Sequence, residues 1–201
     1  AITNAAAATG ANVVGSVSYE LSQQGVINSI GTIRDAASAN GATSVFMTAT
    51  TAGALPLLTQ LLPEAGLDPA TTQYMGLTRW DIPAQTLALP GVQGGWFALP
   101  DPAKTQQFNG RYAATYGGAP HQIGGLAYDG IAAIGALVGA GKSDALTGAA
   151  LTQGAGFQGV NGIFRLRPDG TNDRGLAIAT IQEKKVVVID PAPNSFSGAG
   201  S

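Results

Sequence analysis

Ser44-Val45-Phe46-Met47 is a short, mostly apolar run with the length of a buried strand, and Gln73-Tyr74-Met75-Gly76 repeats the pattern further along the chain. Between them, leucines at positions 55, 58, 61 and 62 recur at helical spacing and predict a helix that ends near Gly66. A strand, a helix and a second strand in this order indicate a βαβ unit, whose two strands lie parallel in one sheet. The stretch therefore predicts an α/β fold of the Rossmann-like kind.

The alternation of helices and strands continues on both sides of this unit, as expected for a parallel sheet. The further predicted elements are an Ala-rich helix over Ala1–Thr9, a strand over Asn12–Tyr19, a helix from Val26 to Asn40, a short helical piece over Pro83–Leu89, a strand over Gly95–Ala98, and helices over Pro102–Tyr116, Leu126–Val138 and Asp144–Leu151.

The last part of the chain changes from alternating elements to consecutive strands. Three strand-like runs follow one another at Gly162–Leu166, Leu176–Ile181 and Val186–Ile189. Pro168-Asp169-Gly170 is a turn signal between the first two, and Glu183-Lys184 separates the last two. We therefore expect a Rossmann-like βαβ lobe with a parallel sheet, closed by an antiparallel meander. The tail 191–201 is rich in Pro, Gly and Ser and is predicted to be disordered.

The composition limits the function to a few classes. The 201 residues are 45% hydrophobic but only 11% charged, with a net charge of −2, so bulk electrostatics gives no attraction to nucleic acid. Cysteine is absent, which excludes disulfides, thiolate metal sites and a cysteine nucleophile. No stretch of about 20 unbroken apolar residues predicts a transmembrane helix, and the N-terminal residues have no signal-peptide pattern.

Motifs that resemble catalytic or nucleotide sites lack their structural context. Gly139–Ser143 resembles the end of a phosphate-binding loop, but it follows a predicted helix, and Gly154–Gly159 matches G-x-G-x-x-G with a helix before it and a strand after it. Both are expected to be ordinary loops. His121 is the only histidine and stands beside Pro120 in a predicted turn, so no catalytic triad is expected. We predict a protein with no catalysis, no cofactor and no metal.

Polar side chains follow two neighbouring strands of the predicted sheet. Thr50 and Thr51 come after the strand at Ser44–Met47, and Thr78, Arg79 and Trp80 come after the next strand. Ligands of open α/β sheets bind beyond the carboxyl ends of the strands, so these five residues are the candidate ligand-binding site. The alternative is that Thr51 and Asp81 cap helices and Trp80 packs at the edge of the lobe.

The order of these elements resembles the later part of the type 1 periplasmic solute-binding proteins, the receptors of branched-chain amino acid ABC transporters. The helix motif F-x-x-x-Y-x-x-x-Y-G matches Phe108–Gly117, and the family's "AYDA" helix is similar to Ala127–Gly130. Phe157–Gly162 followed by Pro168-Asp169-Gly170 resembles the family's F-x-G-v-x-G ending. The resemblance covers nearly the whole chain, and its weight comes from the order and spacing of the motifs.

What the resemblance implies is a two-lobed clamp that closes on a small solute and presents it to a membrane transporter permease in the periplasm. Residues 1–120 and 157–190 would be the C-terminal lobe of this clamp, and 121–156 a helical excursion that normally belongs to the first lobe. The chain would begin after that first lobe. This leaves the oligomeric state open, including a domain-swapped dimer. The family's ligand contacts correspond to Thr50, Thr51 and Thr78.

The chain differs from the amino-acid receptors of this family at Thr78, and it also resembles a second group with a different function. Amino-acid receptors of the family have a carboxylate at about Thr78 to hold an ammonium group, so a free α-amino acid ligand is not expected. Leu77–Pro83 and Gly162–Asn172 are similar to the penicillin-binding protein activators, lipid-anchored lipoproteins with the same fold that bind a peptidoglycan synthase. In that case the region of Arg79, Trp80 and Trp96 would contact a protein. A third alternative is a fragment with no activity of its own.

Overall fold

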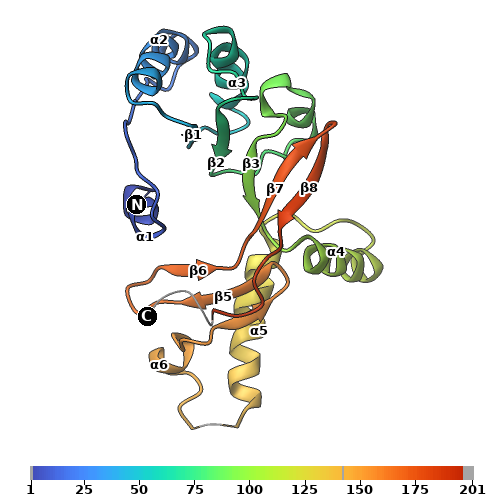
Figure 1. Ribbon diagram of the computed structural model, residues 1–201. Helices are drawn as coiled ribbons and strands as arrows, with labels where there is room; N and C mark the ends of the chain where they lie inside the picture. The colour runs from blue at the N-terminus through green and yellow to red at the C-terminus, as the bar shows by residue number, and fades with distance from the viewer. Residues whose placement is uncertain (1, 142, 197–201) are drawn as a thin grey trace. The chain divides into compact units, whose positions relative to one another are not determined.

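The computed structural model describes residues 2–141 and 143–196 (Figure 1). The chain forms two compact units. The first unit comprises residues 1–98 and 179–187, and the second comprises residues 99–178 and the chain from Val188 onward. No helix among residues 2–141 and 143–196 has both the length and the apolar character that crossing a membrane requires.

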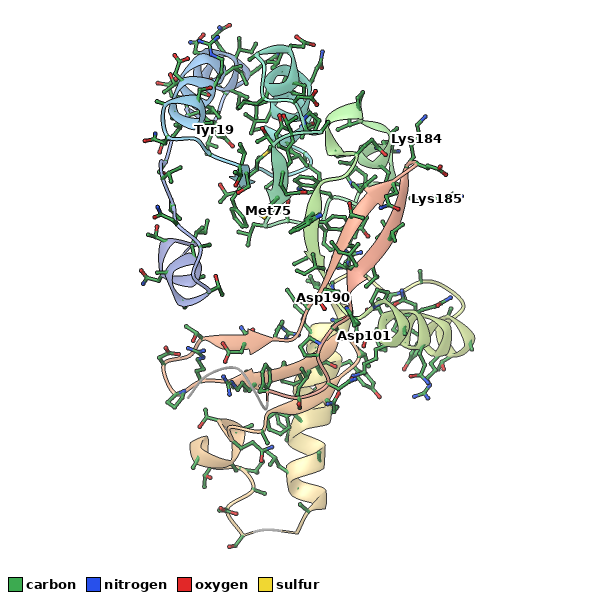
Figure 2. All side chains as sticks on the ribbon, in the orientation of Figure 1. Tyr19, Met75, Asp101, Lys184, Lys185 and Asp190 are labelled. Carbon is green, nitrogen blue, oxygen red and sulfur yellow. The ribbon has the colours of Figure 1, made fainter. Side chains whose placement is uncertain are left out.

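The first unit is built on a five-stranded sheet with the strand order β1-β2-β3-β7-β8. Strands β1 (Ser44–Met47), β2 (Gln73–Gly76) and β3 (Trp96–Leu99) are parallel, with Val45 paired to Tyr74 and Gly76 paired to Phe97. Strands β7 (Ala177–Gln182) and β8 (Lys185–Asp190) complete the sheet. The two-residue turn between them contains Glu183 at φ 49° and Lys184 at φ 62°. Positive φ at both positions is the geometry of a tight hairpin. Figure 2 shows Lys184 and Lys185 at the end of this hairpin.

The helices of the first unit follow from local capping and from the spacing of apolar residues. Helix α1 spans Ile2–Ala8, and helix α2 spans Gln23–Ala39, with the Ser22 hydroxyl accepting a hydrogen bond from the Gly25 N–H at 3.0 Å. Helix α3 (Leu55–Glu64) packs against α2 and against the second of two short 3₁₀ helices, Ala84–Ala88 and Pro90–Val92. Its leucines at 55, 58 and 62 are buried, which fixes α3 in the core.

A proline near the end of α3 shapes its contact with the second 3₁₀ helix. Pro63 has no N–H, so the Thr59 carbonyl loses the hydrogen-bond donor that a helix normally supplies four residues later. The backbone of Gly91 lies against this carbonyl, and any Cβ at that position would overlap it. Glycine at position 91 is therefore required for the close packing of these two elements.

The second unit contains the remaining helices and a small antiparallel sheet. Helices α4 (Pro102–Tyr116), α5 (Gly124–Gly139) and α6 (Gly148–Leu151) precede strands β4 (Phe157–Gly159), β5 (Gly162–Leu166) and β6 (Asn172–Arg174). The three strands pair in the order β4-β5-β6. Its apolar core consists of Ala133, Phe157 and Phe164 with Leu137 packed against them.

The structure confirms the predicted fold class, a mixed α/β fold with a mostly parallel central sheet. The predicted strand at Asn12–Tyr19 was wrong, because these residues pair with no other strand of the described chain. The predicted helix at Asp144–Leu151 is shorter than expected and covers only its last four residues. The predicted single meander is also wrong: β5 pairs with the unforeseen strand β6, and β7 and β8 join the larger sheet.

The predicted lobe boundaries and the predicted disordered tail stay predictions. The assignment of 1–120 and 157–190 to one lobe concerns a two-lobed protein and stays a prediction. The tail predicted to be disordered, 191–201, includes residues 197–201, which lie outside the described residues.

Candidate functional site

The loops that follow β1 and β2 are joined by hydrogen bonds from two threonine hydroxyls. The Thr51 hydroxyl donates to the Ile82 carbonyl at 2.7 Å, and the Thr78 hydroxyl donates to the Ala49 carbonyl at 3.1 Å. Thr51 and Thr78 are half-buried, whereas Thr50 is exposed. Because β1 and β2 are parallel, their carboxyl ends meet at one edge of the sheet. The structure therefore brings these three predicted residues together in one pair of linked loops.

Arg79 is held within its own loop by an ion pair. Its Nε donates to Asp81 Oδ1 at 2.6 Å, and its Nη2 contacts the second oxygen of the same carboxylate. The side chains retain 34% and 15% of their exposure. Two donors on one carboxylate form the bidentate geometry that fixes a guanidinium in place. The pair is neutral as a whole, so this loop presents neither a free cation nor a free carboxylate to a ligand.

Trp80 lies inside the first unit rather than on its surface. Its side chain has 0% relative exposure and stacks on Phe97, with ring centroids 6.2 Å apart and planes inclined by 17°. Gly76 and Gly95 make room for the indole, since a Cβ at either position would overlap it. The Trp80 Nε1 has no hydrogen-bond partner among the described residues. A fully covered indole cannot touch a solute, so its effect on the loop is to fix the backbone between Thr78 and Asp81.

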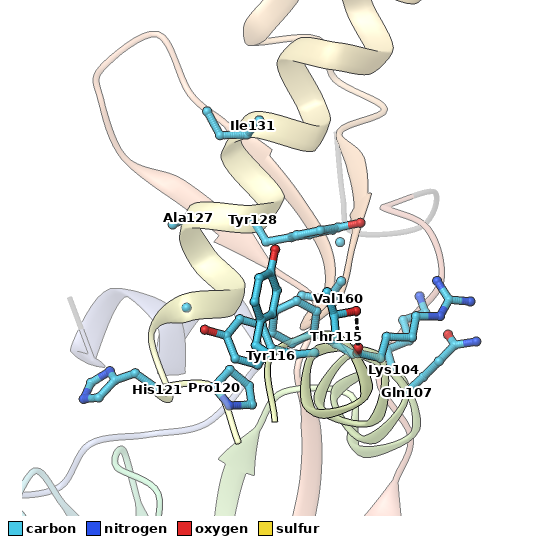
Figure 3. Close-up of a pocket in the computed structure, with 15 residues that line it drawn as sticks. Lys104, Gln107, Thr115, Tyr116, Pro120, His121, Ala127, Tyr128, Ile131 and Val160 are labelled. Carbon is cyan, nitrogen blue, oxygen red and sulfur yellow. Dashed lines mark hydrogen bonds between the residues drawn. The ribbon is translucent and has the colours of Figure 1, made fainter. Parts of the chain in front are cut away.

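A concave surface, which the sequence did not predict, lies in the second unit between α4 and α5 (Figure 3), and none of the five predicted site residues lines it. Its volume is about 830 Å³. Aromatic side chains from both helices line it, together with Lys104, Arg111 and His121. The signal for its α4 wall was present in the sequence as aromatic residues at 108, 112 and 116, one helical turn apart. Its other wall comes from a helix that only the fold brings alongside.

Hydroxyl-bearing side chains mark the loops after β1 and β2, and aromatic and basic side chains line the surface between α4 and α5. Among residues 2–141 and 143–196, no group of three or more His, Cys, Asp or Glu side chains is placed to hold a metal ion. The glycine-rich stretch Gly154–Gly159 begins after helix α6 and ends in strand β4, as predicted. A dinucleotide site has the opposite order, with a strand before the glycines and a helix after them, so this stretch does not fit one. Threonine hydroxyls that already donate to backbone carbonyls offer hydrogen bonds to a solute and no activated nucleophile.

A mostly parallel sheet flanked by helices, with polar loops at the carboxyl ends of its strands, places the first unit in the class of α/β lobes. The sequence agrees with a specific family of this class. Residues 1–185 match the periplasmic binding proteins, and the chain belongs to that family. No curated protein matches the chain.

Solved structures share the fold at low sequence identity. A branched-chain amino acid ABC transporter periplasmic ligand-binding protein from Burkholderia xenovorans has a TM-score of 0.64 at 22% identity, and the match covers 94% of this chain and 55% of that one. A branched-chain amino acid ABC transporter protein from Rhodospirillum rubrum has a TM-score of 0.63 at 18% identity, with coverages of 90% and 53%. An ABC transporter substrate-binding protein from Desulfitobacterium hafniense gives 0.61 at 18%, with coverages of 93% and 54%. The chain thus spans about half the length of these structures.

Proposed function

We propose that this chain is part of the solute-binding receptor of a periplasmic ABC-type transporter, with a small polar solute as its ligand and no catalytic activity. The observation that carries the proposal is the family match over residues 1–185. The pair of loops at the carboxyl ends of β1 and β2 supplies a binding surface of the kind that open α/β sheets use. In this role the partners are the solute and a transporter permease, and no nucleic acid is involved.

The proposed roles of the five predicted residues differ according to their exposure. Thr51 and Thr78 accept hydrogen bonds from the solute, because their hydroxyl protons are already donated to backbone carbonyls, and the exposed Thr50 hydroxyl can donate or accept. Arg79 is held by Asp81 and contributes polarity at the rim. Trp80 supports the loop from within the core.

The charge of the loops favours a solute without a free ammonium group. Asp81 is the carboxylate nearest in sequence to Thr78, and both of its oxygens are occupied by Arg79. An ammonium group in this site would lack the charge-assisted hydrogen bond that a free carboxylate provides. An amide or a sugar fits these loops better than an α-amino acid.

A thermal-shift screen tests the proposal. We expect one small solute among amino acids, amides, sugars, carboxylates and peptidoglycan fragments to raise the melting temperature of the chain. A ligand at a hundredfold excess over its dissociation constant adds about 2.7 kcal/mol of stability, and each kcal/mol raises the melting temperature by roughly 2–4 °C at this chain length.

Matched threonine variants locate the binding site. Thr78→Val removes the hydroxyl and keeps the shape of the side chain, so the ligand-induced shift should be lost. Thr71→Val removes an exposed hydroxyl that donates to the Asp68 carbonyl and should leave the shift unchanged. A shift that survives Thr78→Val, or a screen in which no solute raises the melting temperature, contradicts the proposal.

The alternative function, a lipid-anchored activator that binds a peptidoglycan synthase, has one observation in its favour. Phe46, Met75 and Trp96 are paired across β1, β2 and β3 and share one face of the sheet. Phe46 and Trp96 are each 42% exposed, so this face presents an apolar row with a Trp anchor. Binding of a purified peptidoglycan synthase that is lost in Trp96→Ala, together with a negative solute screen, would support the activator.

A further inference from the structure

The ion pair between Arg79 and Asp81 is part of the same linked loops as the threonines of the solute site. The pair comes directly after Thr78 in the sequence. The residue that follows it, Ile82, supplies the carbonyl to which the Thr51 hydroxyl donates at 2.7 Å. A solute bound at these threonines would therefore lie in a loop that also carries one positive and one negative side chain.

The buried side chain of Trp80 fixes the position of this ion pair. Trp80 stands between the two charged residues in the sequence, has 0% relative exposure, and fills the space that Gly76 and Gly95 leave open. The side chains of Arg79 and Asp81 meet each other and keep 34% and 15% of their exposure. A backbone movement that separated the pair would have to disturb a closely packed indole. The pair is therefore a built part of the loop.

The ion pair leaves no uncompensated positive charge for an anionic solute. Arg79 Nε donates to Asp81 Oδ1 at 2.6 Å, and Nη2 contacts the other carboxylate oxygen, so one edge of the guanidinium is filled. A solute carboxylate at this edge would have to displace Asp81. A solute carboxylate on the remaining N–H groups would lie beside the negative charge of Asp81, which repels it. Both arrangements disfavour an anion.

We propose that Asp81 determines the specificity of the solute site, because it neutralises Arg79 and so excludes anionic solutes in favour of uncharged polar ones; this role rests on the proposed function. Asp81 carries the one carboxylate that pairs with Arg79 in the part of the chain that the structure describes. Without that charge, the loops would combine a guanidinium with threonine hydroxyls, which is the composition of a carboxylate site.

Butyrate and neutral butyramide, which have the same shape, test this role in NMR titrations of the 201-residue chain. We expect Asp81→Asn to bind butyrate at least about tenfold more tightly than the wild type does, because Arg79 becomes available. The affinity for butyramide should change by less than about twofold. The butyrate-induced shifts should fall on the backbone amides of residues 48–51 and 77–82. Adding Arg79→Gln to Asp81→Asn should abolish the gain.

Two further variants separate this effect from net charge and from misfolding. Asp35→Asn makes the same change of charge in the first unit and releases Arg34 from its ion pair, so it should leave the affinity for butyrate unchanged. Asp81→Ser removes the same carboxylate as Asp81→Asn and should give the same gain. The fluorescence of the neighbouring Trp80 and the far-UV circular dichroism should stay as in the wild type if the loop keeps its fold.

The titrations and the solute screen fail in different ways. If the wild type binds a neutral solute through Thr78 but neither Asp81 variant gains affinity for butyrate, the proposed function stands and the role of Asp81 is overturned. Equal binding of butyrate by the wild type and by Asp81→Asn, or a gain that persists after Arg79→Gln, also overturns it. A screen in which no solute binds the wild type removes the proposed function, and the selectivity assigned to Asp81 with it.

Discussion

Asp129 is a carboxylate with 1% relative exposure on helix α5, and its surroundings give the second unit a pH-dependent stability. Its Oδ1 accepts a hydrogen bond from the Val160 N–H at 2.6 Å, and its Oδ2 has no hydrogen-bond partner in the part of the chain that the structure describes. Burial raises the pKa of the carboxyl above 3.8, and the N–H groups of Val160 and Asn161 and the charge of Arg174 oppose this only in part.

The sign of the pH dependence follows from the raised pKa of Asp129. Between 3.8 and the raised pKa the folded chain keeps a proton that the unfolded chain has lost, so the free energy of unfolding falls as pH rises. Asp129→Asn keeps the acceptor for Val160 and removes this titration. In urea unfolding from about pH 4 to about pH 8, the stability of the wild type relative to Asp129→Asn should decrease with pH.

Asp173 serves as a control, because the pKa of its carboxyl is shifted in the opposite direction from that of Asp129. Hydrogen bonds from Arg165 at 2.6 Å and Arg167 at 3.0 Å lower the pKa of its carboxyl. Its stabilising effect is therefore present above 3.8 and is lost as pH falls through the lowered pKa, so in unfolding measurements extended below pH 3.8 the wild type should gain stability over Asp173→Asn as pH rises toward 3.8, and the difference should stay constant above it. If the difference for Asp129→Asn also rises with pH, the assignment of a raised pKa is wrong.

At the residue scale, sequence reasoning predicted the position of the candidate site better than the role of each side chain. Thr51 and Thr78 follow parallel strands, so their meeting at one sheet edge was predictable. The burial of Trp80 was not, because it depends on Gly76 and Gly95, which come from different strands and leave space for the indole. The buried indole agrees with the alternative stated for the sequence, in which Trp80 packs within the lobe and does not contact a ligand.

At the element scale, the contact between α3 and the second 3₁₀ helix gives a prediction about glycine. Gly91→Ala places a Cβ onto the Thr59 carbonyl, and a helix backbone cannot move aside as a side chain can. We expect the free energy of unfolding to drop by about 1–3 kcal/mol, as overpacked cores do. Urea unfolding followed by tryptophan fluorescence measures the loss.

A second glycine variant separates overpacking from backbone entropy. Gly110 lies inside α4 with open space around its Cα, so Gly110→Ala should stabilise the chain by about 0.5–1 kcal/mol. Two variants with the same chemical change should thus have opposite effects. A Gly91→Ala chain as stable as the wild type would show that the two elements are not packed as closely as described.

Elements that depend on neighbours far along the chain were the ones that sequence patterns missed. Helices α2 and α4 and strands β1 and β2 were predicted within a few residues, since their apolar spacing and caps are local. The segment Asn12–Tyr19 has the composition of a strand, but a strand also needs a partner, and none is present in the described chain. The same dependence on partners explains why β5 pairs with β6 rather than with β7.

At the scale of the whole molecule, the chain passes between its two units three times. The boundaries fall at residues 98/99, 178/179 and 187/188, which are positions within β3, β7 and β8. Melting of either unit therefore removes residues from strands that continue into the other. The connectivity predicts that both units unfold in one cooperative transition, although each has its own buried residues.

Tryptophan fluorescence tests this coupling, because Trp80 and Trp96 both belong to the first unit. Gly159→Ala acts on the second unit alone, since its Cβ would overlap the buried Asp129 carboxylate, and it should cost about 1–3 kcal/mol. If the units unfold together, this substitution lowers the urea midpoint seen by tryptophan fluorescence as much as the midpoint seen by far-UV circular dichroism. If Gly159→Ala leaves the fluorescence midpoint unchanged, and circular dichroism shows an additional transition at lower urea concentration, the shared strands do not couple the unfolding of the two units. The wild-type chain would then melt in two steps, and the proposed solute site would depend on the stability of the first unit alone.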